Sequence, residues 1–406
     1  MKILMVAQFY PPTVGGEERV VHDLSVELAG RGHQVAVATL WHEGLPAYEE
    51  LEGVRIHRIR TSLGRLGRVY SDPSRRHAPP FPDPEAVAGL RRVVHAEQPD
   101  IVHAHNWLGY SYVPLKRRDG PRFVASLHDY SLVCTNKRLM RSGRRCAGPV
   151  LKHCIRCSQG QYGRVAGPAL ALSNNATSWA ARIAADMFLP VSRFVAEATQ
   201  VTRGSIPYRV VPNFTRDVPP AVAGADIAEL PDRFIMFAGD FEADKGVPTL
   251  LEAHRGVPGA PPLVLIGRVN REDRARELGE RVRIVGPKPH EFVMEAWRRC
   301  LFGVVPSVVP EAFGLVGLEA MSAGRAVVAT TAGALPDVIG DGGILVHPGD
   351  VTELRAALAR LVHDESLRNE LAAAGRRRAS VFTAAKVIPQ FEQAYRDTLA
   401  VSPSVR

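Results

Sequence analysis

The stretch PEAFGLVGLEAMSAGR at 310–325 places two glutamates, Glu311 and Glu319, eight positions apart among small and apolar side chains. It follows the apolar run LFGVVPS (301–307), so we expect the turn after a buried strand and then a helix. The first N–H groups of a helix carry its positive dipole and bind phosphate oxygens. Glu311 in the turn can accept hydrogen bonds from sugar hydroxyls, and Glu319 leans back toward the helix start, where it can hold a ribose. Glutamates that only charge a helix start would not explain Glu319 inside an apolar stripe, so the stretch predicts a site for a nucleoside diphosphate sugar.

The rest of the chain alternates short apolar runs with helix-period stretches, and it does so in two successive sets. Such alternation predicts an α/β fold with parallel, doubly wound sheets. We expect an N-terminal Rossmann-like domain at 1–212, a Pro- and Ala-rich linker at 213–231, a C-terminal Rossmann-like domain at 232–384, and a last helix at 385–406 that packs back on the first domain. Doubly wound sheets bind ligands beyond the carboxyl ends of their strands, so we expect the two domains to face each other across a cleft. The expected strands are 2–10, 34–40, 54–60, 100–106, 122–129, 187–192 and 208–213 in the first set, and 233–240, 263–268, 282–287, 301–307, 326–331 and 344–349 in the second.

The net charge of +9 suits an acidic partner, such as nucleic acid, anionic lipid or a phosphorylated small molecule, although it can also reflect a GC-rich genome. The basic residues are spread widely and no nucleic-acid-binding module is recognisable, so we expect no nucleic acid partner. No apolar run approaches the ~20 residues of a membrane helix, and the start MKILMVAQFYPP reads as a strand and not as a signal peptide. We expect a cytoplasmic protein, with peripheral contact at the inner membrane face as an open alternative.

These motifs together resemble the retaining family 4 glycosyltransferases with the GT-B fold. PEAFGLVGLEAMSAGRAVVAT is similar to the E-x7-E signature of that family, and the likeness extends over nearly the whole chain. The resemblance implies that Glu311 contacts the transferred sugar and Glu319 the nucleotide ribose. It also implies that the backbone amides of Phe313, Gly314 and Leu315 hold the diphosphate. Further similar segments are TVGGEERVV, GHQVAVAT, PDIVHAHN, SLHDY, FLPVSRF, VVPNF, DKGVPTLLEA and GALPDVIGDGGILVHPGD.

Other expected site residues also follow strands. The resemblance implies that Lys245, in DKG, neutralises the departing phosphate and that His128 lies beside the reacting sugar. Gly15 and Gly16 would shape the loop after the first strand, near the phosphates and the acceptor. A lysine and a helix start supply positive potential where charge develops on the leaving group. Since no carboxylate pair of the DxD kind is recognisable, we expect no catalytic metal.

One position departs from the family pattern. Family members carry Arg after the glycine that precedes the DKG lysine, and here Gly239 is followed by Asp240. A carboxylate beside a diphosphate would repel it unless it is turned away. Arg268, at the end of the next strand, is a candidate replacement in the donor site, and the alternative is that it only solvates the strand end.

A basic insert at 134–157 follows His128 and contains seven Lys or Arg and no acidic residue. Its cysteines have the spacing C-x11-C-x7-C-x2-C, and the C-x2-C pair matches metal-ligand spacing. Structural zinc and free or redox thiols are both open interpretations, with an iron–sulfur cluster as a third. The basic charge suits a phosphorylated or lipid-linked acceptor, and a solvated surface is the plain alternative. The four cysteines are Cys134, Cys146, Cys154 and Cys157.

The sequence therefore predicts a retaining, metal-independent glycosyltransferase. It would move a hexosyl group from a nucleotide-sugar donor to a sugar, glycan or lipid-linked acceptor. A sugar-nucleotide epimerase on the same fold is one alternative, and it needs no acceptor. A non-catalytic nucleotide-sugar-binding protein is another, and the aspartate at position 240 makes it worth testing.

Overall fold

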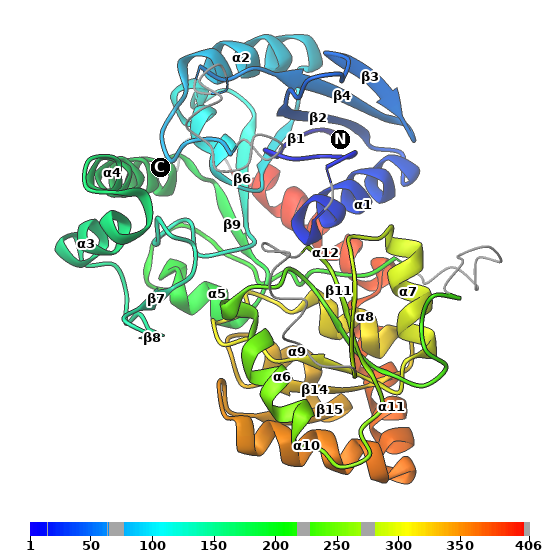
Figure 1. Ribbon diagram of the computed structural model, residues 1–406. Helices are drawn as coiled ribbons and strands as arrows, with labels where there is room; N and C mark the ends of the chain where they lie inside the picture. Colours follow the sequence, from blue (N-terminus) through cyan, green and yellow to red (C-terminus); the bar gives the residue numbers. More distant parts are fainter. Residues whose placement is uncertain (14, 63, 65–76, 217–227, 269–280, 402–406) are drawn as a thin grey trace. The chain divides into compact units, whose positions relative to one another are not determined.

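The computed structural model describes residues 1–13, 15–62, 64, 77–216, 228–268 and 281–401 (Figure 1). By their internal contacts the residues form two compact units, the first made of 1–212 with 384–406 and the second of 213–383. Each unit contains its own sheet of mainly parallel strands, as expected for a chain with two doubly wound domains. Part of the expected linker, 217–227, lies outside the described residues.

In the described part of the first unit, seven strands form one sheet. The first strand lies near its middle, where Met5 pairs with Val37 on one side and His103 on the other. All neighbouring strands are parallel except the first two of the sheet order, which run antiparallel. The order is β3 (Tyr48–Leu51), β4 (Val54–Ile59), β2 (Gln34–Leu40), β1 (Lys2–Val6), β5 (Ile101–Ala104), β6 (Arg122–Leu127), β9 (Met187–Pro190).

The second unit has a six-stranded sheet in its described residues, and all its neighbouring strands are parallel. Parallel strands that are covered on both faces consist of continuous apolar residues, as FGVV at 302–305 illustrates. The order is β12 (Val282–Val285), β11 (Leu263–Ile266), β10 (Ile235–Ala238), β13 (Phe302–Val305), β14 (Ala326–Thr330), β15 (Gly343–Val346).

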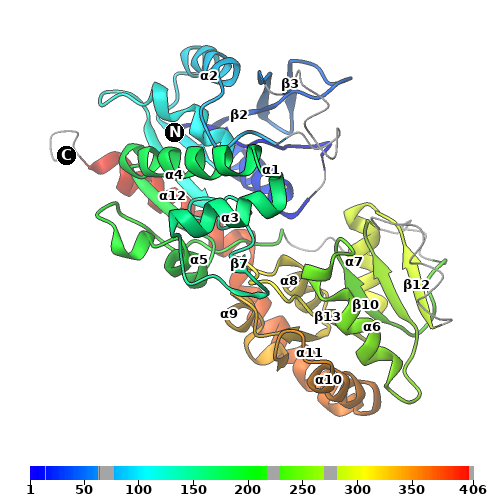
Figure 2. The same ribbon diagram turned by 60° about the vertical axis from the view of Figure 1, so that its left-hand side comes forward.

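Helices connect the strands in both units (Figures 1 and 2). None of the helices within the described ranges has the length and apolar character needed to cross a membrane. The first unit contains α1 (Gly16–Gly30), α2 (Pro84–Glu97), α3 (Leu151–Tyr162), α4 (Ala166–Ala184), α5 (Arg193–Ala198) and α12 (Ala384–Ala400). The second contains α6 (Val247–Arg255), α7 (His290–Arg299), α8 (Leu315–Ser322), α9 (Leu335–Ile339), α10 (Val351–His363) and α11 (Glu365–Ala379).

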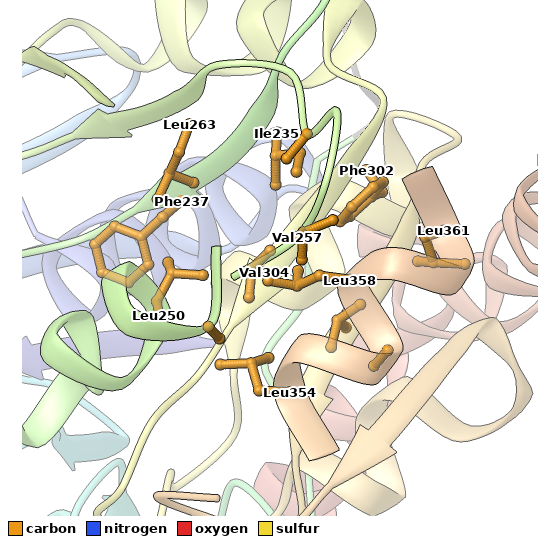
Figure 3. Packing of buried hydrophobic residues seen from close by; sticks show 14 of the residues in the cluster. Ile235, Phe237, Leu250, Val257, Leu263, Phe302, Val304, Leu354, Leu358 and Leu361 are labelled. Atoms are coloured by element: carbon orange, nitrogen blue, oxygen red, sulfur yellow. The ribbon is translucent and has the colours of Figure 1, made fainter. Parts of the chain in front are cut away.

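Packing in the second unit follows directly from its sequence pattern. Leu354, Leu358 and Leu361 recur at helical spacing on α10 and are buried against β10 and β13 (Figure 3). Asp350 begins this helix, since its carboxylate accepts hydrogen bonds from the N–H groups of Thr352 and Glu353. Each fully buried leucine contributes about 1.5–3 kcal/mol. The resulting core holds the strand ends that carry the candidate site.

The last helix belongs to the first unit. On α12, Tyr395 lies within hydrogen-bond distance of His103 on β5, and Glu392 contacts His33. The amphipathic pattern of α12 therefore finds its partners almost three hundred residues earlier in the chain. Residues 402–406 of the expected helix lie outside the described residues.

The sequence missed two hairpins and overpredicted one strand. The strand pair β3–β4 and the pair β7 (Met140–Arg141) and β8 (Arg144–Arg145) are each joined by two residues with positive φ, a turn whose twist suits hairpins. A full strand at 208–213 is wrong. The segment donates N–H groups to the carbonyls of Phe188 and Pro190 but forms only an isolated bridge, because the prolines at 207 and 212 have no N–H to extend the pairing.

Candidate active site

A compact polar network lies at the carboxyl end of β13 in the second unit. Lys245 Nζ is 2.8 Å from Glu311 Oε1, and the hydroxyl of Ser307 donates to the same oxygen. The Ser307 carbonyl in turn accepts a hydrogen bond of 2.7 Å from the hydroxyl of Thr330 on β14. The structure therefore brings together two of the expected catalytic residues, 66 positions apart in the chain, and adds a serine that the sequence analysis did not single out.

Two close approaches of the backbone position this network. Gly246 follows Lys245 with φ of +73°, and a Cβ there would lie 1.8 Å from the carbonyl oxygen of Pro306. Gly333 has φ of +69°, and a Cβ there would lie 2.2 Å from the carbonyl oxygen of Glu311. Only glycine fits such positions, so both loops are pressed against the end of β13. Glycine at position 246 therefore matches the family motif and is also required by the close contact with the Pro306 carbonyl.

The electrostatics of the pair keep both side chains charged. Burial by itself would raise the pKa of Glu311, but the ammonium of Lys245 and the hydroxyl of Ser307 outweigh it and lower that pKa. The Glu311 carboxylate raises the pKa of Lys245. The lysine side chain is 39% exposed and the glutamate 17%, so the cation remains accessible from outside. An incoming diphosphate would compete with Glu311 for this ammonium.

The start of α8 offers backbone donors beside this pair. Gly314 precedes the helix with φ of +102°, and the helix begins at Leu315, slightly later than the sequence suggested. Among the described residues, the N–H groups of Phe313 and Gly314 donate to no protein group. Unsatisfied N–H groups at a helix start, with the helix dipole behind them, are suited to phosphate oxygens.

Glu319 lies one to two turns into α8 and is only 4% exposed. Its neighbours on the helix, Leu318 and Ala320, are fully buried, so the carboxylate sits within an apolar stripe, where the sequence placed it. The structure thus places this carboxylate inside the helix that follows the Lys245–Glu311 network, and its contact with a ribose stays a prediction.

The departure at Asp240 has a local explanation. Arg268 holds the Asp240 carboxylate in a fork, with Nε to Oδ1 at 3.1 Å and Nη2 to Oδ2 at 2.8 Å. Both side chains are about 40% exposed (41% and 39%), so the pair itself stabilises the fold by no more than ~1 kcal/mol. The fork neutralises the carboxylate that would otherwise repel a diphosphate. Arg268 is thus engaged with Asp240, and its use as a phosphate ligand stays a prediction that requires this fork to open.

In the first unit, three histidines lie near one another: His103 is within β5, and His105 and His128 directly follow the ends of β5 and β6. His128 follows β6, and its Nε2 lies 3.0 Å from Nδ1 of His105, which follows β5. His103 contacts Ser126 Oγ and Tyr395 Oη, each at 2.8 Å. Burial lowers the pKa of His103 to about 3 and that of His105 well below its usual value. A neutral imidazole has one donor and one acceptor nitrogen, so His105 orients the ring of His128.

A second cluster adjoins the glycine loop of the first unit. Gly15 is extended and precedes α1, which begins at Gly16, so the two glycines lie between the loop after the first strand and the helix that follows it. Glu17 Oε1 accepts a hydrogen bond of 2.6 Å from Asn106 Nδ2. Burial of its carboxylate, together with the charge of Asp129, raises the pKa of Glu17 to about 8, although the residue keeps part of its surface exposed. This acidic cluster was not predicted.

Lys137 connects this cluster to the basic insert. Its ammonium lies 3.6 Å from Asp129 Oδ2 and 4.2 Å from the centre of the Trp107 ring. Asp129 directly follows His128, so the insert contacts the segment that carries the expected catalytic histidine. The signals that could have revealed these residues are the HAHN motif at the end of β5 and the glutamate that follows the glycine pair.

The four insert cysteines line one small cavity of about 30 Å³. All four are free thiols, and burial raises the pKa values of Cys134, Cys154 and Cys157. The amide of Asn136 lies 3.2 Å from the Cys157 sulfur, and Cys146 donates to the Gly148 carbonyl at 3.4 Å. Within the described ranges, no three or more His, Cys, Asp or Glu side chains are placed to hold a metal ion. The choice among structural zinc, free or redox thiols and an iron–sulfur cluster therefore stays a prediction.

The comparisons with known proteins cover both units. Residues 14–216 match the family described as Glycosyltransferase Family 4, and residues 226–378 match the one described as Glycosyl transferases group 1. Glycogen synthase of Mycobacterium tuberculosis is 27% identical over 412 residues, which is 93% of this chain and 90% of that protein. Sucrose-phosphate synthase from Thermosynechococcus elongatus superposes with a TM-score of 0.75 at 21% identity, covering 98% of this chain and 100% of that one. HepE from Anabaena in complex with UDP-glucose superposes with a TM-score of 0.68 at 18% identity, covering 98% and 99%.

The two sheets, their strand order and these similar structures define the GT-B fold, and the chain is a glycosyltransferase. It belongs to glycosyltransferase family 4. The resemblance inferred from the E-x7-E stretch is thereby confirmed for family and fold.

The raised pKa of Glu17 predicts a specific pH dependence. A carboxyl group whose pKa is about 8 in the folded chain and near 4.5 in the unfolded chain binds a proton only when folded between these values, so the free energy of unfolding falls as the pH rises through this window. Glu17→Gln removes this term. We expect the variant to gain roughly 1–2 kcal/mol relative to the wild type between pH 6 and pH 8, measured by denaturant unfolding. Glu27→Gln on the same helix is the control, and parallel pH curves for the wild type and Glu17→Gln would contradict the assignment.

Proposed function

We propose that this glycosyltransferase takes its sugar from a nucleoside diphosphate donor and transfers it, with retention of configuration and without a divalent metal, to a hydroxyl of a sugar, glycan or lipid-linked acceptor. The observation that carries the proposal is the Lys245–Glu311–Ser307 network beside the unpaired N–H groups of Phe313 and Gly314. One cation, one sugar-binding carboxylate and free amide donors are what a charged sugar donor requires. The presence of UDP-glucose in the similar structure of HepE supports a nucleotide-sugar donor.

The second unit would bind the donor. The N–H groups of Phe313, Gly314 and Leu315 would hold the diphosphate at the start of α8, and Glu319 would accept hydrogen bonds from the ribose hydroxyls. Arg268 would add a contact to the phosphates if its fork with Asp240 opens. Burial of Glu319 supports this role, because hydrogen bonds to a buried carboxylate are strong and directional.

The ion pair suggests how donor binding prepares the reaction. The donor phosphate would replace Glu311 as the partner of the Lys245 ammonium. The Glu311 carboxylate would then be free to accept hydrogen bonds from the sugar hydroxyls. Binding would thus convert an ion pair within the protein into two contacts with the donor, an ion pair between Lys245 and the phosphate and hydrogen bonds from the sugar hydroxyls and Ser307 to the Glu311 carboxylate.

The chemical step breaks the bond between the anomeric carbon and the phosphate oxygen and forms a bond between that carbon and the acceptor oxygen. The acceptor proton passes to the leaving phosphate, and Lys245 stabilises the charge that develops there. Retention by a double displacement would require a well-placed carboxylate nucleophile. In this scheme Glu311 contacts the sugar hydroxyls and keeps its hydrogen bond from Ser307, so reaction on the front face of the sugar is the better match.

The first unit would act on the acceptor side. His128, oriented by the neutral His105, would donate to or accept from a hydroxyl of the reacting sugar. The loop at Gly15 and Gly16 would approach the phosphates and the acceptor. The basic insert that Lys137 connects to Asp129 suits an acceptor with phosphate groups.

The function itself is tested by a donor screen with two readouts. UDP-, GDP-, ADP- and TDP-sugars are compared by thermal shift, since a ligand that binds only the folded state raises the melting temperature. We expect one nucleotide class to raise it and its sugar to be transferred only when an acceptor glycan is added. Nucleotide release without any acceptor would support the epimerase alternative, and binding without turnover would support a non-catalytic binding protein.

The two glutamates are expected to behave differently when replaced. Glu319→Ala should weaken donor-nucleotide affinity roughly ten- to a hundredfold, because a hydrogen bond to a charged group contributes ~1.5–3 kcal/mol. Glu311→Ala should mainly slow transfer and leave nucleotide affinity closer to that of the wild type. Calorimetry with the free nucleoside diphosphate separates these effects. Unchanged nucleotide affinity in Glu319→Ala would rule out the ribose contact.

Metal independence gives a further prediction. Transfer should continue after exhaustive chelation of divalent ions, because Lys245 and the α8 amides supply the positive potential. Lys245→Ala should reduce the rate by ~10²-fold or more, as expected for loss of one preorganised donor. Lys288→Ala is a matched control that also removes a lysine from an ion pair in the second unit. Loss of turnover on chelation with recovery on adding magnesium would show that the metal-free mechanism is wrong.

A further inference from the structure

The net charge of the chain is concentrated in one segment of the first unit. Residues 130–185 contain nine Lys or Arg and no Asp or Glu, which equals the net charge of +9 for the whole chain. Individual basic residues are spread widely, but outside this segment acidic residues balance them. The segment spans the insert, α3 and α4. The basic residues are Lys137, Arg138, Arg141, Arg144, Arg145, Lys152, Arg156, Arg164 and Arg182.

Helix α4 presents its large apolar side chains outward. Trp179 is 68% exposed, Ile183 61%, Leu172 49% and Val165, just before the helix, 87%. Together with the exposed Ala169 and Ala176, they recur every three or four positions, the spacing of a continuous stripe. The opposite, buried face consists of small and polar residues, namely Gly167, Ala171, Asn174, Thr177, Ser178 and Ala181. The usual arrangement of an amphipathic surface helix is thus reversed.

The apolar stripe adjoins the basic insert. A hollow of about 220 Å³ is lined by Trp179 and Arg182 of α4 together with Leu151 of α3. A wider hollow of about 660 Å³ is lined by Arg141 and Arg145, with Val150 and His153. The two hollows share Pro149 and Gln200, so they are neighbours. Figures 1 and 2 show α3 and α4 side by side in the first unit.

We propose that this surface, formed by the α4 stripe, the start of α3 and the basic insert, docks on the surface of an anionic lipid bilayer. An amphipathic face with Trp and aliphatic residues beside Lys and Arg is the chemistry that binds at the boundary between headgroups and acyl chains. The apolar side chains enter the boundary and the basic ones meet the anionic headgroups. Near such a surface each basic side chain strengthens binding by roughly fivefold.

The charge pattern disfavours the other occupants. In a symmetric dimer through this surface, the same patch of each copy would meet itself, and nine positive charges would face nine. Nucleic acid would satisfy the basic residues but would leave the exposed Trp, Leu, Ile and Val in water. An anionic bilayer accounts for both features. The inference does not rest on the proposed function, because none of these side chains belongs to the donor site.

The test measures binding of the full chain to vesicles by sedimentation. Vesicles of phosphatidylcholine mixed with phosphatidylglycerol should bind the protein, and vesicles of phosphatidylcholine alone should bind it roughly tenfold or more weakly. Raising the salt concentration should weaken binding to the anionic vesicles, because it screens the basic residues. Equal binding to both kinds of vesicle, or binding to neither, would overturn the proposal.

Two sets of variants separate the apolar and the basic contributions. The pair Trp179→Gln and Ile183→Gln should reduce the partition coefficient roughly tenfold. The triple variant Arg144→Gln with Lys152→Gln and Arg156→Gln should reduce it roughly a hundredfold. The control is Tyr48→Gln with Leu51→Gln, which also removes two half-exposed apolar side chains from the first unit. Melting curves show whether each variant is folded. If the control lowers binding as much as the α4 pair does, the surface is wrongly assigned.

Tryptophan fluorescence locates the contact. Trp107 and Trp297 are 6% and 0% exposed, and Trp41 is partly buried, with the Arg60 guanidinium over its ring and its Nε1 donating to the Leu45 carbonyl, so a blue shift on adding anionic vesicles should come mainly from Trp179. Trp179→Phe should keep vesicle binding and lose the shift. Light scattering of the protein without lipid measures whether the surface binds a second copy of the chain. A dimer that the α4 pair of substitutions abolishes, in a protein that does not bind anionic vesicles, would assign the surface to a second copy instead.

Discussion

Close contact between backbone segments at the end of β13 determines the geometry of the second unit. The carbonyl groups of Pro306 and Glu311 are approached so closely by glycine positions 246 and 333 that no side chain fits at either one. Since these contacts involve main-chain atoms, they fix where the loops of β10, β13 and β14 meet. The side chains of Lys245 and Glu311 are then brought within 2.8 Å as a consequence. An ion pair at partly exposed positions would not by itself impose such order.

The polar groups of both units are balanced within the protein and would exchange their partners on binding a ligand. Lys245 is paired with Glu311, and Asp240 with Arg268. These four charged side chains of the proposed donor site therefore have partners of opposite charge within the protein. His105, neutral through burial, fixes one neighbour and adds no charge. A binding site arranged in this way avoids unpaired buried charge before the donor arrives. When the donor binds, its phosphates would take the place of the Glu311 carboxylate beside the Lys245 ammonium.

Much of the fold was predictable, because parallel sheets demand continuous apolar runs that are visible in the sequence. The strand, turn and helix around 301–325 were predicted in the correct order for the same reason, although the helix begins only at Leu315. The side-chain contacts between segments that are far apart in the sequence were not predictable. Ser307 and His105 act through contacts across neighbouring strands, which no periodicity records, and the Asp240 fork depends on a side chain 28 positions away. On α4 the apolar pattern was legible, but which face is buried is decided by the packing of its small residues on the rest of the unit.

The contact between Tyr395 and His103 has a consequence for biosynthesis. The two residues are separated by 292 positions, and the second unit lies between them in the chain. Until α12 has been translated, the first unit lacks the helix that packs against β6 and reaches His103. The second unit, by contrast, is continuous in sequence and can fold as soon as it emerges. His103 therefore gains its Tyr395 partner only after α12 has been made, although its contact with Ser126 and the contact between His105 and His128 lie within the first unit's sheet.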